Sequence, residues 1–285
     1  MKRLMTYLAV CALALVALVW FGLPPALTAM GLHPQYQSPA MNLKGRRALI
    51  ITTSHATLDP KGDATGVFAS EMTAPYYAFL DAGMAVDIAS IKGGDIPVEP
   101  ASLRWPVISP PDQRFQDDPQ FQSKLRSSMA IAAVDIGAYD IVFLAGGWGA
   151  AYDFAQSAAL GAQISRAYAR GAVVGGVCHG PLGLFPAKAP DGKPLVQGRR
   201  ISAVTDKQIR ELGVTFTPKH PERDLRAAGA RFEADTRFRD FFANHVSVDG
   251  RLVTGQNQNS GAETAHRMME VALKQANPPR PIAPK

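Results

Sequence analysis

The chain has 285 residues, 47% of them hydrophobic and 19% charged, a composition that excludes wholesale disorder, a collagen-like repeat and a coiled-coil rod. Its two cysteines are too few for a disulfide scaffold. The net charge of +6 is concentrated at the ends: residues 1–47 and 274–285 hold eight basic residues and no acidic one, and residues 48–273 carry a net −2. A nearly neutral body argues against nucleic-acid binding, which needs a basic face.

The N-terminal segment is long and apolar enough to enter a membrane. Residues 4–23 form an uncharged run of 20 residues, and 20 helical residues span about 30 Å, the thickness of a bilayer's hydrocarbon core. A cleaved signal has a shorter apolar region and small residues before the cut, whereas the nearest candidate cut, after Ala29, follows the bulky Leu27. We therefore expect residues 1–23 to be a retained anchor, with a removed signal and secretion as the alternative.

Both interpretations of this segment export the rest of the chain. Lys2 and Arg3 precede the apolar run and favour a cytoplasmic N-terminus. The body is then expected outside the cytoplasm, on the periplasmic side in a bacterium. Residues 24–44 contain four prolines and predict an extended linker between membrane and body.

Residues 45–276 are expected to form a single α/β domain. Short aliphatic runs typical of buried parallel strands alternate with longer segments whose apolar residues have helical spacing. The expected strands are residues 47–53, 85–90, 141–145 and 172–177, and the expected helices are 66–82, 120–134 and 150–170. Such alternation predicts a doubly wound, flavodoxin-like sheet, mostly parallel, with helices on both faces.

The remaining segments complete this domain. Residues 92–121 are rich in Pro, Asp and Gln and are longer than an ordinary connection, so they are either a lid or a solvated insertion. Later elements are expected as a strand at 200–204, a helix at 221–228, a hairpin joining 244–248 to 252–255, and a helix at 261–275. The Pro-containing tail, residues 277–285, is expected to be disordered.

The strongest local signal is the sequence AVVGGVCHGP at residues 172–181. A buried strand ends before Cys178, and flanking glycines allow an abrupt turn that presents a nucleophile at the strand's carboxyl end. The N–H groups of a following helix favour a thiolate, and the adjacent His179 offers a base. The competing interpretation is a buried structural cysteine beside a chance histidine.

Two weaker signals fall near the same edge of the predicted sheet. The sequence AGGWG at 145–149 could bring the backbone of Gly147 and Trp148 to an oxyanion, or could be a tight turn only. Glu71 begins a predicted helix, where a glutamate usually serves the helix dipole in solvent. If that helix start faces the carboxyl edge of the sheet, Glu71 becomes a desolvated carboxyl that stays protonated beside Cys178.

Together with these motifs, TGVFASEMTAPY at 65–76 and LVTGQNQNSGAETA at 252–265 resemble the class I glutamine amidotransferase-like superfamily. More narrowly, they resemble its PfpI-like branch, which contains glutathione-independent glyoxalases (glyoxalase III), protein deglycases and heat-inducible chaperones. The resemblance implies Cys178 as nucleophile, His179 as its neighbour and Glu71 as the carboxyl that tunes the thiol. It also implies oxyanion contacts from Gly147 and Trp148.

Three positions depart from the pattern of these relatives. Many relatives carry His where Trp148 stands and Pro where Gln258 stands. The acid that orients the histidine falls at Ile209 in our register. Asp206 is then a tentative substitute for the third acid, and Glu211 lies nearby.

The resemblance implies an enzyme in which Cys178 attacks a small reactive aldehyde such as methylglyoxal, yielding lactate, or removes early glycation adducts. No cofactor is expected, and the six histidines lack the paired spacing of a zinc site. The alternatives are a cell-envelope holdase or redox sensor, and a cysteine peptidase or amidase. Glutamine amidotransfer is not expected, because neither His245 nor His266 is followed two residues later by glutamate. A homodimer is compatible with the resemblance.

Overall fold

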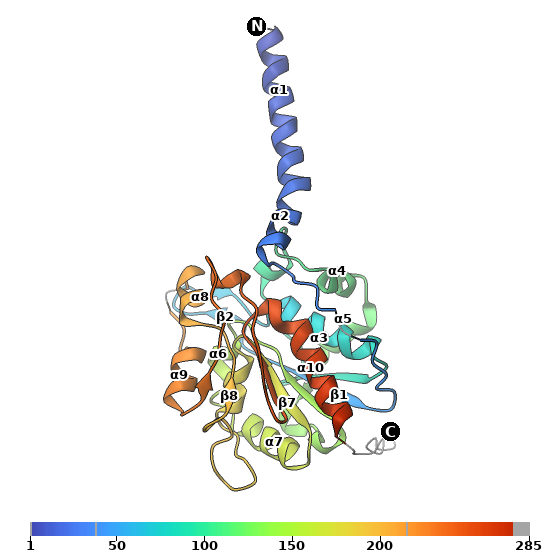
Figure 1. Ribbon diagram of the computed structural model, residues 1–285, viewed down its shortest axis with the longest axis vertical. Coiled ribbons are helices and arrows are strands. Elements are labelled where there is room, and N and C mark those ends of the chain that lie inside the picture. Colours follow the sequence, from blue (N-terminus) through green and yellow to red (C-terminus); the bar gives the residue numbers. More distant parts are fainter. Residues whose placement is uncertain (1, 38, 215, 276–285) are drawn as a thin grey trace.

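The computed structural model describes residues 2–37, 39–214 and 216–275, which fold around a seven-stranded sheet (Figure 1). All neighbouring strands are parallel except the β10–β11 hairpin. In spatial order, the strands are β10 (Val246–Asp249), β11 (Leu252–Gly255), β7 (Val173–Val177), β6 (Ile141–Leu144), β1 (Arg47–Thr52), β4 (Ala85–Ser90) and β5 (Met129–Ala130). The predicted mostly parallel α/β sheet is confirmed.

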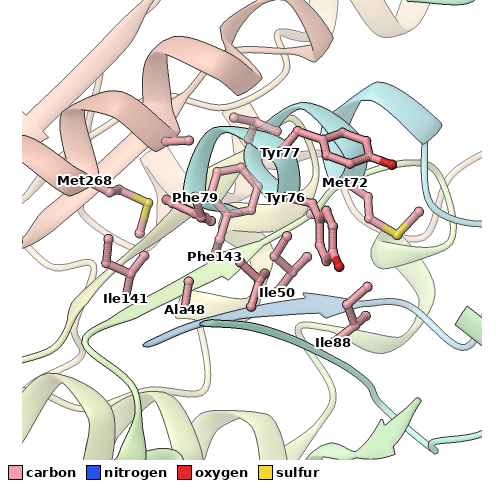
Figure 2. Packing of buried hydrophobic residues seen from close by; sticks show 14 of the residues in the cluster. Ala48, Ile50, Met72, Tyr76, Tyr77, Phe79, Ile88, Ile141, Phe143 and Met268 are labelled. Carbon is pink, nitrogen blue, oxygen red and sulfur yellow. The ribbon is translucent and has the colours of Figure 1, made fainter. Parts of the chain in front are cut away.

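Helices cover both faces of this sheet because its strands are apolar on both sides. Helices α3 (Ala69–Asp81) and α10 (Gly261–Lys274) pack on one face, and α7 (Ala158–Ala169) packs on the other. Figure 2 shows the first layer, where Phe79 of α3 meets Phe143 of β6 edge to face at 6.2 Å between ring centroids. Truncating such a buried Phe to Ala typically costs about 3–5 kcal/mol, so this layer fixes α3 firmly on the sheet.

Smaller elements surround the sheet. Two-stranded sheets pair β2 (Thr57–Leu58) with β3 (Asp63–Ala64) and β8 (Arg200–Ile201) with β9 (Arg231–Phe232). The strand expected at 200–204 therefore lies outside the main sheet. Short helices around the sheet include α8 (Asp206–Glu211), α9 (Pro221–Ala227) and the 3₁₀ turns η3 (Ile131–Ala133), η4 (Ile136–Ala138), η5 (Gly180–Leu184), η6 (Asp240–Phe242) and η7 (Gln258–Ser260).

Two predicted helices are shorter than expected. The helix expected at 120–134 ends early as α5 (Pro119–Arg126), because Ser128 bonds to Ser90 and to the carbonyl of Gly94 and carries the chain into the edge strand β5. The helix expected at 150–170 is broken into α6 (Ala150–Asp153) and α7, which starts anew where the Ser157 side chain caps it. Local capping overrides the apolar periodicity in this second case.

The long segment 92–121 is partly helical rather than a plain loop. It contains η2 (Pro100–Leu103) and α4 (Pro110–Gln116), and α4 starts with a capping box between Ser109 and Asp112. Asp112 also accepts a hydrogen bond from Thr73 of α3 at 2.6 Å. The segment is therefore bonded to the helix that carries Glu71.

The N-terminal segment is one apolar helix from Arg3 to Met30, 28 residues long. It comprises α1 (Lys2–Ala17), the π-turn η1 (Leu18–Gly22) and α2 (Leu23–Met30), and it projects away from the body (Figure 1). The extended linker expected at 24–44 is thus helical in its first part, because Pro24 and Pro25 occupy the start of α2, where proline is tolerated. The disordered tail expected at 277–285 lies outside the described residues.

Candidate active site

Cys178 occupies the sharp turn between β7 and η5. Its φ of +59° is in the left-handed region, which a non-glycine residue adopts only under strain. A Cβ atom at Gly176 or Gly180 would lie 2.1 Å from the carbonyl oxygen of Leu144, so both flanking positions need glycine. The backbone N–H of Cys178 donates to Gly255 of β11 at 3.1 Å. Close packing against two neighbouring strands thus holds the predicted elbow in place.

Cys178 lines a cavity of about 290 Å³ at the carboxyl edge of the sheet. Every residue that the sequence assigned to the site except Asp206 also lines this cavity. The full lining is Phe68, Glu71, Glu99, Ala101, Val107, Gly147, Trp148, Cys178, His179, Val204, Gln208, Leu212, Val214, Phe241 and Gln258. A small, mainly apolar pocket with a few polar groups is typical of a small-molecule site.

Glu71 comes to the cavity from the first turn of α3 and is almost fully buried, with 1% exposure. A Cβ atom at Gly146 would lie 2.4 Å from Glu71 Oε2 and 2.8 Å from Cys178 Cβ, so the missing side chain of Gly146 makes room for the pair. Burial raises the pKa of Glu71 to about 8, against the opposing effect of the Cys178 thiol and the N–H groups of Gly146 and Gly147. Glu71 is therefore a protonated carboxyl at neutral pH rather than a solvated one.

The expectation of a resting thiolate at Cys178 is wrong. Burial raises the pKa of the thiol, a negative charge on Glu71 would raise it further, and the N–H groups of Gly147 and His179 only moderate that rise. The sequence suggested a helix whose dipole would stabilise the anion, but η5 is a five-residue 3₁₀ turn. The thiol is therefore neutral at rest, and it would need a base in order to act as a nucleophile.

His179, at the adjacent position, is placed to act as such a base. Its Nδ1 lies 3.4 Å from Cys178 Sγ, and burial lowers the pKa of its imidazole to about 3. The ring is therefore neutral and can accept the thiol proton. Its Nε2 is buried and has no hydrogen-bond partner among the described residues, while the ring of Trp148 packs on it with centroids 4.9 Å apart.

The tentative third acid, Asp206, is not joined to this pair. Its carboxylate lies 3.3 Å from Nδ1 of His220, and its backbone N–H donates to Glu222. Ile209, the position of the acid in relatives, has 2% exposure and belongs to the apolar cluster that includes Cys178. Among the described residues, no carboxylate bonds to His179, so the assignment of Asp206 to a triad is wrong.

Sequence reasoning missed the pair Gln208 and Gln258 as cavity residues. The Gln208 amide donates to Gln258 at 3.2 Å, and both side chains line the cavity beside His179. Gln258 attracted notice only because relatives carry proline there. Gln258 in place of proline could have revealed the pair from the sequence, because a buried amide side chain needs a polar partner.

Gly147 adopts a φ of +100°, and a Cβ atom there would lie 2.4 Å from both Gly66 O and Phe68 N. Only glycine fits this position, which brings the Gly147 N–H to the sulfur of Cys178. The N–H groups of Gly147 and His179 both favour negative charge at the nucleophile. Within the described residues, no group of three His, Cys, Asp or Glu side chains could hold a metal ion.

A doubly wound α/β sheet with a strained cysteine at a strand end, a buried glutamic acid and an adjacent histidine defines a class of cysteine-elbow proteins. The profile of the DJ-1/PfpI family matches residues 64–271 of this chain. The chain belongs to the DJ-1/PfpI family, as its resemblance to the PfpI-like branch predicted.

Its similarity to individual proteins extends over most of the body. The chain is 32% identical over 236 residues to a Saccharomyces cerevisiae protein named glutathione-independent glyoxalase HSP31, covering 79% of this chain and 97% of the relative. It is 28% identical over 244 residues to glutathione-independent glyoxalase hsp3101 of Schizosaccharomyces pombe, covering 81% and 98%. The crystal structure of glyoxalase III from Candida albicans superposes with a TM-score of 0.71 at 27% identity, covering 80% and 97%.

Proposed function

We propose that the chain is a glyoxalase III-like enzyme that converts methylglyoxal and similar small 2-oxoaldehydes to 2-hydroxy acids. The observation that carries this proposal is the convergence of Cys178, neutral His179 and protonated Glu71 on one small cavity. The names of the relatives support the same reaction class.

In the first step, His179 Nδ1 takes the thiol proton and Cys178 Sγ bonds to the aldehyde carbon, forming a hemithioacetal. The N–H of Gly147 faces the sulfur and is placed to stabilise the oxygen that gains charge. His179 then moves the proton of the former aldehyde carbon to the neighbouring ketone oxygen, giving an enediol. It next moves the proton of the hemithioacetal hydroxyl to the neighbouring carbon, leaving a 2-hydroxy thioester. Water cleaves the thioester, so methylglyoxal plus one water yields lactate and free Cys178.

Glu71 acts on the sulfur rather than on the substrate. A protonated Glu71 donates to the thiolate as the proton moves to His179, whereas an ionised Glu71 would repel it. The buried carboxyl therefore keeps an anionic nucleophile accessible in an apolar pocket.

Replacing Cys178 with Ala tests this proposal directly. We expect turnover of methylglyoxal to fall to the level of the buffer, with Cys11→Ala as matched control because Cys11 lies in the exposed N-terminal helix. Undiminished lactate formation by the Cys178→Ala protein would overturn the assignment. The same pair of proteins, supplied with glycated N-acetyl-lysine, tests whether the site also removes early glycation adducts.

We also propose that residues 3–30 anchor the enzyme in a membrane with the body outside the cytoplasm. A mean hydropathy of 2.4 over an 18-residue stretch of this helix, none of it buried in the body, supports this arrangement. In a bacterial host, protease added to intact spheroplasts should digest the body and spare a cytoplasmic marker. The mass of the mature chain distinguishes a retained helix from a cleaved signal.

A further inference from the structure

The apolar helix meets the body through a stacked pair of tryptophans. The rings of Trp20 and Trp105 lie 5.4 Å apart with planes only 11° from parallel. Trp20 belongs to the uncharged run 4–23, and Trp105 lies between η2 and α4 with 42% of its surface exposed. A bilayer that contains the apolar run therefore reaches the depth of Trp105.

A second segment also lies against the helix base. A Cβ atom at Gly31 would lie 2.6 Å from the carbonyl oxygen of Phe242, so the two backbones are in contact. Met30 and residues 235–239 line a hollow beside this contact. Phe238 of that loop is 91% exposed and Met30 is 45% exposed, so two large apolar side chains of the same hollow face outward, as at a surface that contacts a partner.

Basic groups accompany these aromatic rings. Arg104, Arg237 and Arg239 are all exposed, and none of their guanidinium groups forms an ion pair with a described residue. Arginines pair well with phosphate groups, and tryptophan rings are enriched at the level of lipid headgroups. A bilayer interface offers both apolar chains and charged phosphate groups. The aromatic and basic side chains around the helix base are suited to contact both.

The two segments at the helix base also form walls of the catalytic cavity. Ala101 and Val107 flank Trp105 in sequence and line the cavity, and Phe241 follows Arg239 and lines it too. His33, just after the helix, donates its backbone N–H to Asn259, next to the cavity residue Gln258. The catalytic cavity is therefore built on the same side of the body as the helix base.

We propose that Trp105, Phe238, Arg237 and Arg239 form a lipid-contacting surface, and that the catalytic cavity takes substrates from the bilayer interface. The substrate class is then 2-oxoaldehydes with an apolar chain, which concentrate in that interface. This inference rests on the proposed membrane anchoring and activity. The apolar cavity walls at Val107, Leu212 and Phe241 suit such a chain.

The lipid contact is tested on the full chain in vesicles of phosphatidylcholine and phosphatidylglycerol with bromine on their acyl chains. In a Trp20→Phe, Trp148→Phe background, Trp105 is the sole tryptophan, and we expect its fluorescence to be quenched. The control carries Trp105→Phe as well and reports from Lys193→Trp, a position whose side chain is 72% exposed. Lys193 belongs to the loop before β8, and this loop lies at the end of the body away from α1 (Figure 1). Absent quenching of Trp105, or equal quenching at both sites, overturns the proposal.

The substrate class is tested with Phe238→Asp in unbrominated vesicles of the same lipids. We expect kcat/KM for a long-chain 2-oxoaldehyde to fall by roughly tenfold, because the substitution withdraws one large aromatic ring from lipid. Methylglyoxal turnover should be unchanged, because Phe238 does not line the cavity. No loss, or equal loss on both substrates, overturns the substrate assignment. Failure of the wild-type chain on both aldehydes rejects the proposed activity and this substrate class, while the quenching result still decides the lipid contact.

Discussion

The indole of Trp148 packs on the imidazole of His179, with ring centroids 4.9 Å apart and planes tilted by 52°. Packing thus restrains a histidine whose Nε2 has no hydrogen-bond partner among the described residues. In a catalytic triad a carboxylate orients the histidine. Here the ring of Trp148 packs against His179 instead.

Trp148→Ala should therefore lower kcat/KM for methylglyoxal by about tenfold to a hundredfold, because a mobile His179 imidazole is less often in position to accept the thiol proton. Trp148→Phe retains a ring against His179 and should stay within about threefold of the wild type. Steady-state kinetics of both variants check this prediction. Equal loss in the two variants would point to the indole N–H rather than to packing.

Asp206→Asn should leave kcat/KM within about twofold of the wild type, since the carboxylate pairs with His220 rather than with His179. His179→Asn, by contrast, should reduce the rate by about a hundredfold or more through loss of the base. His245→Asn is a suitable control because His245 does not line the cavity. A large effect of Asp206→Asn on kcat would restore it to the catalytic machinery.

The pH profile should report the ionisation of Glu71. Because the pKa of Glu71 is raised to about 8, kcat/KM is expected to fall above that pH as the carboxylate repels the developing thiolate. Glu71→Gln keeps a neutral donor and should lose this alkaline limb while remaining active near neutrality. A wild-type rate that stays flat through pH 9 would contradict the role given to Glu71.

Stability should depend on the same group. Glu71 has a raised pKa in the folded chain, against 4.5 when unperturbed, so its favourable contribution is complete below pH 4.5 and is lost as the pH rises to about 8. Relative to Glu71→Gln, the wild type should lose up to about 1.4 kcal/mol of unfolding free energy per pH unit in that window. Urea unfolding of both chains in mild detergent at pH 5 and pH 8 measures the difference.

Gly146→Ala should disable the site more than it harms the fold. The added methyl would lie 2.4 Å from Glu71 Oε2 and 2.8 Å from Cys178 Cβ, displacing the carboxyl and costing about 1–3 kcal/mol of overpacking. Gly261→Ala is the matched control, because its methyl would meet only ordinary contacts at 3.4 Å or more. Lactate formation and thermal unfolding separate the two effects.

The sequence predicted the central strands because most of their residues are apolar, whereas the short edge strand β5 lies inside a segment that was expected to be helical. It also placed Cys178 at an elbow, since glycines at 176 and 180 have few other uses beside a strand end. The ionisation of the thiol was not predictable, because it depends on how deeply Glu71 is buried and on η5 being a short 3₁₀ turn. Asp206 was misassigned because sequence proximity does not show that its side chain turns to His220.

The left-handed backbone at Cys178 has a consequence for the protein's history. A non-glycine residue in this conformation costs about 1–2 kcal/mol, so a glycine at position 178 would raise the stability of the fold but would remove the thiol. Selection for stability alone would favour that exchange. Keeping a cysteine in a turn that favours glycine therefore lowers the stability of the fold and retains the thiol.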